Sequence, residues 1–249
     1  MPTSIKPSLA RYAASNNSSA PRHLGTRYDA SGNFLQEPGN TVVCHLVSGS
    51  ASERAVLDVR NRMMSMTDAS KLTFTPVSSL HMTLFQGIIE YRRAFPYWPR
   101  DVSLDTSIEA MTDLYLNRLE GFKGVGTFKI KAIDVTPVGL TVKGATAEDD
   151  AIIKSWRDAL SEPFGYRHPD HDTYVFHITF AYLIDWLSED RLAAWQGLFD
   201  DCLTFLEREA PIIEIHPPAF CCFNDMRHFE VLLMLGSRHQ ETPTMSLAK

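Results

Sequence analysis

Two short stretches of the sequence place a histidine and a threonine two residues apart inside an apolar run. The first, SSLHMTLFQG, holds His81 and Thr83, and the second, YVFHITFAYL, holds His177 and Thr179. Side chains alternate between the two faces of a β-strand. Each stretch is therefore predicted to bury an apolar face and to present its histidine and threonine together on the opposite face.

Two histidines and two threonines suit the cleavage of a phosphoester. Attack on phosphorus needs a base for the nucleophile and an acid for the leaving oxygen, and histidine, with a pKa near ~6.5, serves as either. Threonine hydroxyls can donate to the non-bridging oxygens, where charge grows, and no metal ion is required. A single strand of this kind usually faces solvent. Two copies, one in each half of the chain, favour a shared site in which one imidazole is neutral and the other charged.

Strands and helices alternate around these motifs. Apolar, β-branched runs predict short strands and hairpins, and helical periodicity predicts helices over 50–66, 105–122, 145–165 and 188–209. Each half has a strand, a helix and further strands, with one His-x-Thr strand apiece. We therefore predict an α+β fold with two lobes. The predicted organisation is a flexible tail and turn-rich lead-in at 1–38, one domain over 39–240, and a C-terminal tail at 241–249.

Composition limits the function classes. The 249 residues are enough for a sizeable core, and a net charge of −6 argues against long nucleic acid as the main partner, while a small anionic ligand is allowed. The four cysteines have no CxxC spacing and are interpreted as reduced thiols. No run reaches the ~18–20 apolar residues of a membrane span, and no apolar signal core is present. We expect a cytoplasmic protein without membrane contact.

The motifs HMTL and HITF resemble the paired signatures of the two-histidine (2H) phosphoesterase superfamily, which contains bacterial 2′,5′-RNA ligases and cyclic nucleotide phosphodiesterases. The resemblance runs from about residue 40 to residue 236 in element order. The stretches EPGNTVVCHL, TPVSSLHMTLFQG, YRRAFPYWP and YRHPDHDTY look like a bacterial branch whose physiological substrate is not established. The continuations FQG and AYL after the motifs depart from the common pattern.

The resemblance implies a fold and a set of roles. The fold would be two pseudo-symmetric lobes, each with an antiparallel sheet and helices, and an active-site groove between them. His81 and His177 would be acid and base, and Thr83 and Thr179 would donate to phosphate oxygens. No cofactor is expected.

Several other residues are candidates for substrate binding. Phe85 shares the predicted face of His81 and could stack on a base or sugar, or could be ordinary core. Tyr97 and Trp98 lie in an aromatic, basic loop that could form a lid, or could be a solvated loop pinned by the tryptophan. Arg167, in the loop before the second motif, could clamp a phosphate.

Two further features carry alternatives. The loop RHPDHD holds His168, Asp170, His171 and Asp172, which could ligate a metal, but the spacing matches no standard zinc pattern and a charged surface turn is the alternative. His45 is either a third residue of the site or a hydrogen-bonded structural histidine.

The leading hypothesis is a metal-independent phosphodiesterase acting on a cyclic phosphate or a small phosphodiester of a nucleotide or short oligonucleotide. Three alternatives remain open: a non-catalytic binder of a phosphorylated metabolite, a metal-dependent hydrolase built on the histidine-rich loop, and a 2′,5′-RNA end-joining ligase.

Overall fold

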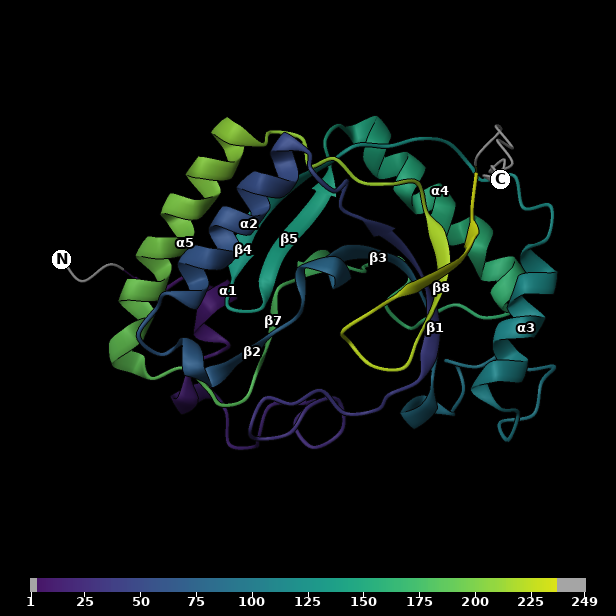
Figure 1. The fold of residues 1–249 in the computed structure, drawn as a ribbon, viewed down its shortest axis with the longest axis horizontal. Coiled ribbons are helices and arrows are strands. Elements are labelled where there is room, and N and C mark those ends of the chain that lie inside the picture. Colours follow the sequence, from purple (N-terminus) through teal and green to yellow (C-terminus); the bar gives the residue numbers. More distant parts are fainter. Residues whose placement is uncertain (1–3, 237–249) are drawn as a thin grey trace, which may run out of the picture.

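A seven-stranded antiparallel sheet is the central element of the computed structural model, which describes residues 4–236 (Figure 1). The strand order is β4-β5-β6-β3-β1-β8-β9, and a small second sheet pairs β2 with β7. The strands are β1 (Gly39–His45), β2 (Leu72–Phe74), β3 (His81–Ile89), β4 (Ile130–Thr136), β5 (Gly139–Gly144), β6 (Phe176–Thr179), β7 (Ala181–Leu183), β8 (Ala219–Phe223) and β9 (Glu230–Met234).

The helices lie in two groups. They are α1 (Pro7–Ala10), α2 (Ala51–Met64), α3 (Ile108–Leu119), α4 (Ala147–Phe164) and α5 (Glu189–Glu209). Helices α2 and α5 pack together on one side of the molecule, and α3 and α4 on the other (Figure 1). Local sequence sets their ends: Thr146 and Asp149 form a capping box before α4, and Gly165 ends it in the left-handed conformation with φ 76°.

The two faces of the sheet differ in what covers them. Val42 and Cys44 of β1 belong to the large core, which also contains the buried faces of the helices. Val43, between them, points to the opposite face, where a smaller apolar cluster includes Phe223 and Phe229 of the β8–β9 hairpin. The large core thus fixes the sheet from one side, and the second face is left for other contacts.

The predicted α+β class is confirmed, but the sheet differs from the expectation of one in each lobe. The strands of both halves join edge to edge into a single sheet, because β6 from the second half pairs with β3 from the first. Within the described residues, none of the helices combines the length and apolarity that crossing a bilayer requires.

The segment before β1 lies against the domain. Leu9, Ala13 and Tyr28 are buried, and the Tyr28 hydroxyl donates to the Leu183 carbonyl at 2.6 Å. This packing differs from the loose tail expected over 1–38, because the segment carries its own apolar anchors among the serines. The expected C-terminal tail, 241–249, lies outside the described residues.

Candidate active site

The two motifs meet on neighbouring strands. Strands β3 and β6 pair with Met82 opposite Ile178. Because antiparallel partners count in opposite directions, this register sets the histidine of each motif across from the threonine of the other. The four side chains share one face of the sheet, the face of Val43. They are called the quartet here: His81, Thr83, His177 and Thr179.

The flanking strands extend the quartet into two rows across the sheet. In the first row, β5 and β1 add Gly139 beside Thr179 and His45 beside His81; in the second, they add Thr141 beside His177 and Val43 beside Thr83. The two histidines are diagonal neighbours on adjacent strands, a relation that puts their Cβ atoms about 7 Å apart. One tetrahedral anion can bridge two imidazoles at that spacing.

Both imidazoles are anchored in the same way. The Nδ1 atom of His81 lies 2.7 Å from the Ser79 carbonyl, and that of His177 lies 3.1 Å from the Val175 carbonyl. A carbonyl only accepts hydrogen bonds, so Nδ1 carries the proton in each ring and Nε2 has the lone pair when the ring is neutral. The backbone of each motif therefore orients its histidine with Nε2 available for chemistry.

The surroundings of His81 keep it neutral. Burial, with smaller effects of the neighbouring His45 and His177 rings, lowers the pKa of His81 to about 3, against the opposing effect of the hydrogen bond to the Ser79 carbonyl. The ring lies 5.8 Å from that of His45 and 4.2 Å from that of Phe229, which meets it edge-on. Sequence reasoning missed Phe229, whose approach depends on how the β8–β9 hairpin folds over the sheet.

His177 is the more exposed member of the pair. Desolvation by the surrounding protein lowers the pKa of His177, the hydrogen bond to Val175 raises it, and the positive charges of Arg27 and Arg11 lower it again. The Tyr174 ring lies 6.1 Å from the His177 ring. The two arginines come from the segment before β1, so this segment contributes to the electrostatics of the quartet.

The structure contradicts a substrate-binding role for Phe85. A β-bulge shifts the register of β1 and β3, so that consecutive residues Val43 and Val42 pair with Thr83 and Phe85. The extra residue in β3 turns Phe85 to the core face, where it is 0% exposed and packs 4.8 Å from the ring of Phe164. Strict alternation from His81 fails at this bulge.

A buried arginine on α4 ties the two motifs together. Arg157, 3% exposed, donates to the Leu84 carbonyl at the bulge (2.7 Å) and to the His171 carbonyl in the loop before β6 (3.2 Å). Its guanidinium also lies 4.4 Å from the centre of the Tyr174 ring. The available signal in the sequence was an arginine at a position where the helical period of Ile153, Trp156 and Leu160 predicts an apolar residue.

The remaining predicted binding residues lie elsewhere. Trp98 is fully buried and donates from Nε1 to the Ser103 carbonyl at 3.1 Å, so the structure contradicts its predicted contact with substrate. Tyr97 is half-buried, with the Arg92 guanidinium 4.4 Å above its ring. Arg167 is exposed and forms ion pairs with Asp158 at 2.9 Å and Asp172 at 3.3 Å. These two carboxylates pair with the guanidinium that was predicted to bind phosphate.

The histidine-rich loop brings together three groups that could ligate a metal. Ligand atoms of Asp158, His171 and Asp172 lie within 4.8 Å of one another. Both carboxylates also bind Lys154, at 3.1 and 3.0 Å, and both bind Arg167. Two cationic side chains already balance the two carboxylates, so the arrangement is accounted for as a surface ion-pair network.

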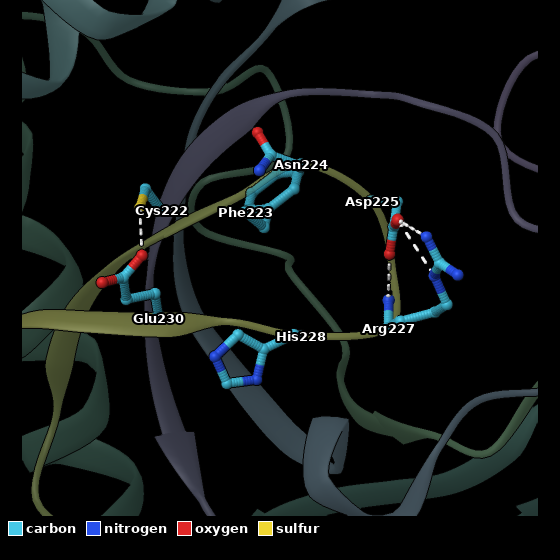
Figure 2. A pocket seen from close by; sticks show the side chains of 7 residues that line it. All are labelled: Cys222, Phe223, Asn224, Asp225, Arg227, His228 and Glu230. Carbon is cyan, nitrogen blue, oxygen red and sulfur yellow. Dashed lines mark hydrogen bonds and ion pairs between the residues drawn. The ribbon is translucent and has the colours of Figure 1, made fainter.

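A pocket of about 270 Å³ is lined by residues of the β8–β9 hairpin and not by the quartet (Figure 2). Its lining residues are Cys222, Phe223, Asn224, Asp225, Arg227, His228 and Glu230. Asp225 accepts from Arg227 in an ion pair at 2.6 Å, so the charges of this pocket are largely satisfied within the hairpin.

Comparison with known proteins identifies the family. Residues 27–141, which contain the first motif, match the family model described as 2H-phosphodiesterase, domain of unknown function (DUF1868). The chain belongs to the 2H phosphoesterase superfamily. A conserved protein of unknown function from Agrobacterium tumefaciens strain C58, known from a crystal structure, shares 52% sequence identity with this 2H phosphoesterase. The match covers 92% of this chain and 99% of that one, and the two structures superpose with a TM-score of 0.91. None of the curated proteins matches the chain. The superfamily places it among phosphoesterase-type enzymes, and the second motif lies outside the matched range.

Proposed function

We propose that this 2H phosphoesterase is a metal-independent phosphodiesterase that opens a cyclic phosphate or cleaves a small phosphodiester of a nucleotide or short oligonucleotide. The observation that carries the proposal is the quartet: two imidazoles on adjacent strands, each with Nδ1 held by its own backbone and each beside the other motif's threonine. The proposed active site is a groove over this face of the sheet.

In the proposed reaction, one imidazole Nε2 removes a proton from water as the water oxygen bonds to phosphorus. The bond from phosphorus to the leaving oxygen breaks, and the other imidazolium donates its Nε2 proton to that oxygen. The hydroxyls of Thr83 and Thr179 donate to the non-bridging oxygens, where negative charge accumulates.

We assign His81 as the base and His177 as the acid. His81 is half-buried beside His45, and its pKa is lowered to about 3, so it resists protonation before the reaction. His177 is more exposed, and a bound phosphate anion offsets the positive charge of Arg27 and Arg11 that lowers its pKa. His177 is therefore the ring that takes up a proton when substrate binds.

The experiment is a panel of cyclic nucleotides and short phosphodiesters assayed with EDTA present. The wild type should turn over at least one of them, and His81→Ala and His177→Ala should each reduce kcat about 10²–10⁴-fold with unchanged circular dichroism. His216→Ala, at an exposed histidine outside the quartet, is the matched control and should keep full activity.

The alternatives give different results in the same panel. Tight binding without product for every compound would indicate a non-catalytic binder. Activity lost in EDTA and restored by zinc or manganese would indicate a metal-dependent hydrolase, and a 2′,5′-linked product would indicate end joining. Wild-type rates in both histidine variants would contradict the proposed mechanism.

A further inference from the structure

Three arginines, from two segments that are distant in the sequence, act on His23, whose ring lies near that of Tyr182. Arg22 and Arg27 belong to the segment before β1, and Arg92 belongs to the turn after β3. They are called the arginine cluster here. Burial, together with the smaller effects of the positive charges of Arg27, Arg22 and Arg92, lowers the pKa of His23 to about 4.

The Tyr182 ring connects the arginine cluster to the face of the quartet. The Arg27 guanidinium lies 5.3 Å from the centre of this ring, and the His23 ring lies 6.4 Å from it. Tyr182 also packs against the apolar cluster that contains Phe229, and Phe229 meets the His81 ring at 4.2 Å. The cluster and the histidines therefore lie on the same side of the sheet.

Arg92, in the turn after β3, reaches back to Gln86 of that strand. It donates to the Gln86 side chain at 3.2 Å, and its buried Nε has no partner. The buried hydroxyl of Tyr174, whose ring neighbours that of His177, is also without a partner. One buried donor on Arg92 and one on Tyr174 thus remain unused.

Within the described residues, an acidic side chain pairs with one of the three arginines of the cluster. Arg27 pairs with Glu37 at 2.6 Å. Over residues 4–236, Arg22 and Arg92 form no ion pair, although the protein as a whole carries a net charge of −6. Concentrated cationic side chains in an acidic protein favour binding of an anion at that place.

We propose that the arginine cluster is a second anion subsite, which binds a phosphate of the substrate other than the one that is cleaved. The proposal rests on the proposed function and names the substrate class: a nucleotide with a scissile cyclic or diester phosphate at one end and a further phosphate at the other.

The spacing along β3 agrees with a ligand of this size. Thr83 of the quartet and Gln86, which binds Arg92, pair with Val43 and Thr41, which are two residues apart on β1, so they lie roughly 7 Å apart along the strand. A ribose with phosphates on opposite sides spans a comparable length. Arginine suits this role because its planar guanidinium pairs with phosphate through two hydrogen bonds.

The test compares adenosine 2′-phosphate with adenosine 2′,5′-bisphosphate by calorimetry at low salt. The wild type should bind the bisphosphate about tenfold more tightly or better. Arg22→Gln and Arg92→Gln should each reduce that ratio several-fold, and the double variant should bring it close to one. Arg22 is exposed, so its substitution leaves the fold intact. Arg100→Gln, at an exposed arginine in the same loop as Arg92, is the matched control and should keep the ratio.

A wild-type ratio near one, or an unchanged ratio in the double arginine variant, would overturn the subsite. The calorimetry measures binding and not turnover, so its result does not depend on whether the protein hydrolyses a phosphodiester. His81→Ala with His177→Ala should keep the preference for the bisphosphate. A preserved preference without hydrolysis of any phosphodiester would retain the subsite and reject the phosphodiesterase, and hydrolysis without the preference would do the reverse.

Discussion

At the residue scale, the orientation of the two imidazoles follows from a repeated local contact. In each motif the ring reaches back to the carbonyl two residues earlier, which lies just before the strand begins. The contact fixes the tautomer without help from a distant carboxylate. The two rings nevertheless differ, because His81 adjoins His45 and Phe229, whereas His177 adjoins Tyr174 and the arginines of the N-terminal segment.

This difference predicts an unequal response to the leaving group. A p-nitrophenolate leaving group needs little protonation, so on bis(p-nitrophenyl) phosphate His177→Ala should lose far less than the about 10²–10⁴-fold expected with an alkoxide leaving group. His81→Ala, which lacks the base, should lose a similar factor on both substrates. Steady-state kcat values for the two variants measure this. Equal losses for both variants on both substrates would contradict the assignment of acid and base.

The face shared by the quartet could be predicted from sequence because strand alternation holds within each three-residue motif. The same rule failed two residues later at Phe85, where the β-bulge inserts a residue into β3. Trp98 fits the alternative given for its loop, in which the tryptophan pins the loop to the domain, because it is buried and bonded to the Ser103 carbonyl. His45, one candidate for a third residue of the site, lies beside His81. The N-terminal arginines reach the site through tertiary packing, which local patterns do not encode.

At the element scale, the hairpin β4–β5 supports the second motif through a glycine. Gly139 has a φ of 137°, and a Cβ at this position would collide with the Ile178 carbonyl of β6. Gly139→Ala should therefore destabilise the fold by about 1–3 kcal/mol and reduce kcat by displacing His177 and Thr179. Chemical denaturation and steady-state kinetics measure the two effects.

Gly49→Ala is the matched control for Gly139. Its φ of 77° also disfavours alanine, though less than a φ of 137° does, and nothing lies within 4 Å of the added methyl group. It should cost some stability and leave kcat unchanged. If Gly139→Ala behaved in the same way as this control, the close approach of β5 to β6 would have no role in positioning the motif.

Helix α4 supports both motifs through Arg157. Arg157→Met keeps the volume but leaves the carbonyls of Leu84 and His171 without their donor, so the free energy of unfolding should fall by about 2–5 kcal/mol. Activity should fall through kcat more than through KM, because the side chain touches no substrate. Arg157→Lys should restore part of both. A variant as stable and active as the wild type would show that the bulge holds itself in place.

At the scale of the whole molecule, one continuous seven-stranded sheet replaces the two separate sheets that were expected, one in each lobe. The predicted repeat of strand, helix and strands in each half is present, but the pairing of β3 with β6 makes the halves continuous. Sequence patterns predict which segments are strands, whereas the partner of each strand depends on contacts between residues far apart in the chain. The packing of residues 4–38 was missed for the same reason.

Several buried histidines predict how stability depends on pH. Burial lowers the pKa of His81 to about 3 and those of His23 and His168 to about 4, below the ordinary value of 6.5. Between about pH 6.5 and 4 the unfolded chain binds protons at these rings and the folded chain does not, so the free energy of unfolding should decrease as the pH falls. Above pH 6.5 these rings are neutral in both states and contribute no slope.

Urea denaturation at a series of pH values measures this dependence. His168→Gln keeps a donor for the Gln86 carbonyl and removes one buried titrating group, so its stability should change less between pH 6.5 and 4 than that of the wild type. A wild-type stability that is constant or rises over this range would contradict the burial of these rings.

If His81 and His177 share one phosphate, an NMR titration should show both rings responding to the same bound anion. Protein labelled with ¹⁵N at histidine is titrated with inorganic phosphate, and the Nε2 resonances of the two rings are followed. Both resonances should shift with a single dissociation constant, and His81→Ala should weaken the phosphate-induced shift of the His177 resonance. A response from only one ring, or two rings with separate dissociation constants, would contradict a shared phosphate.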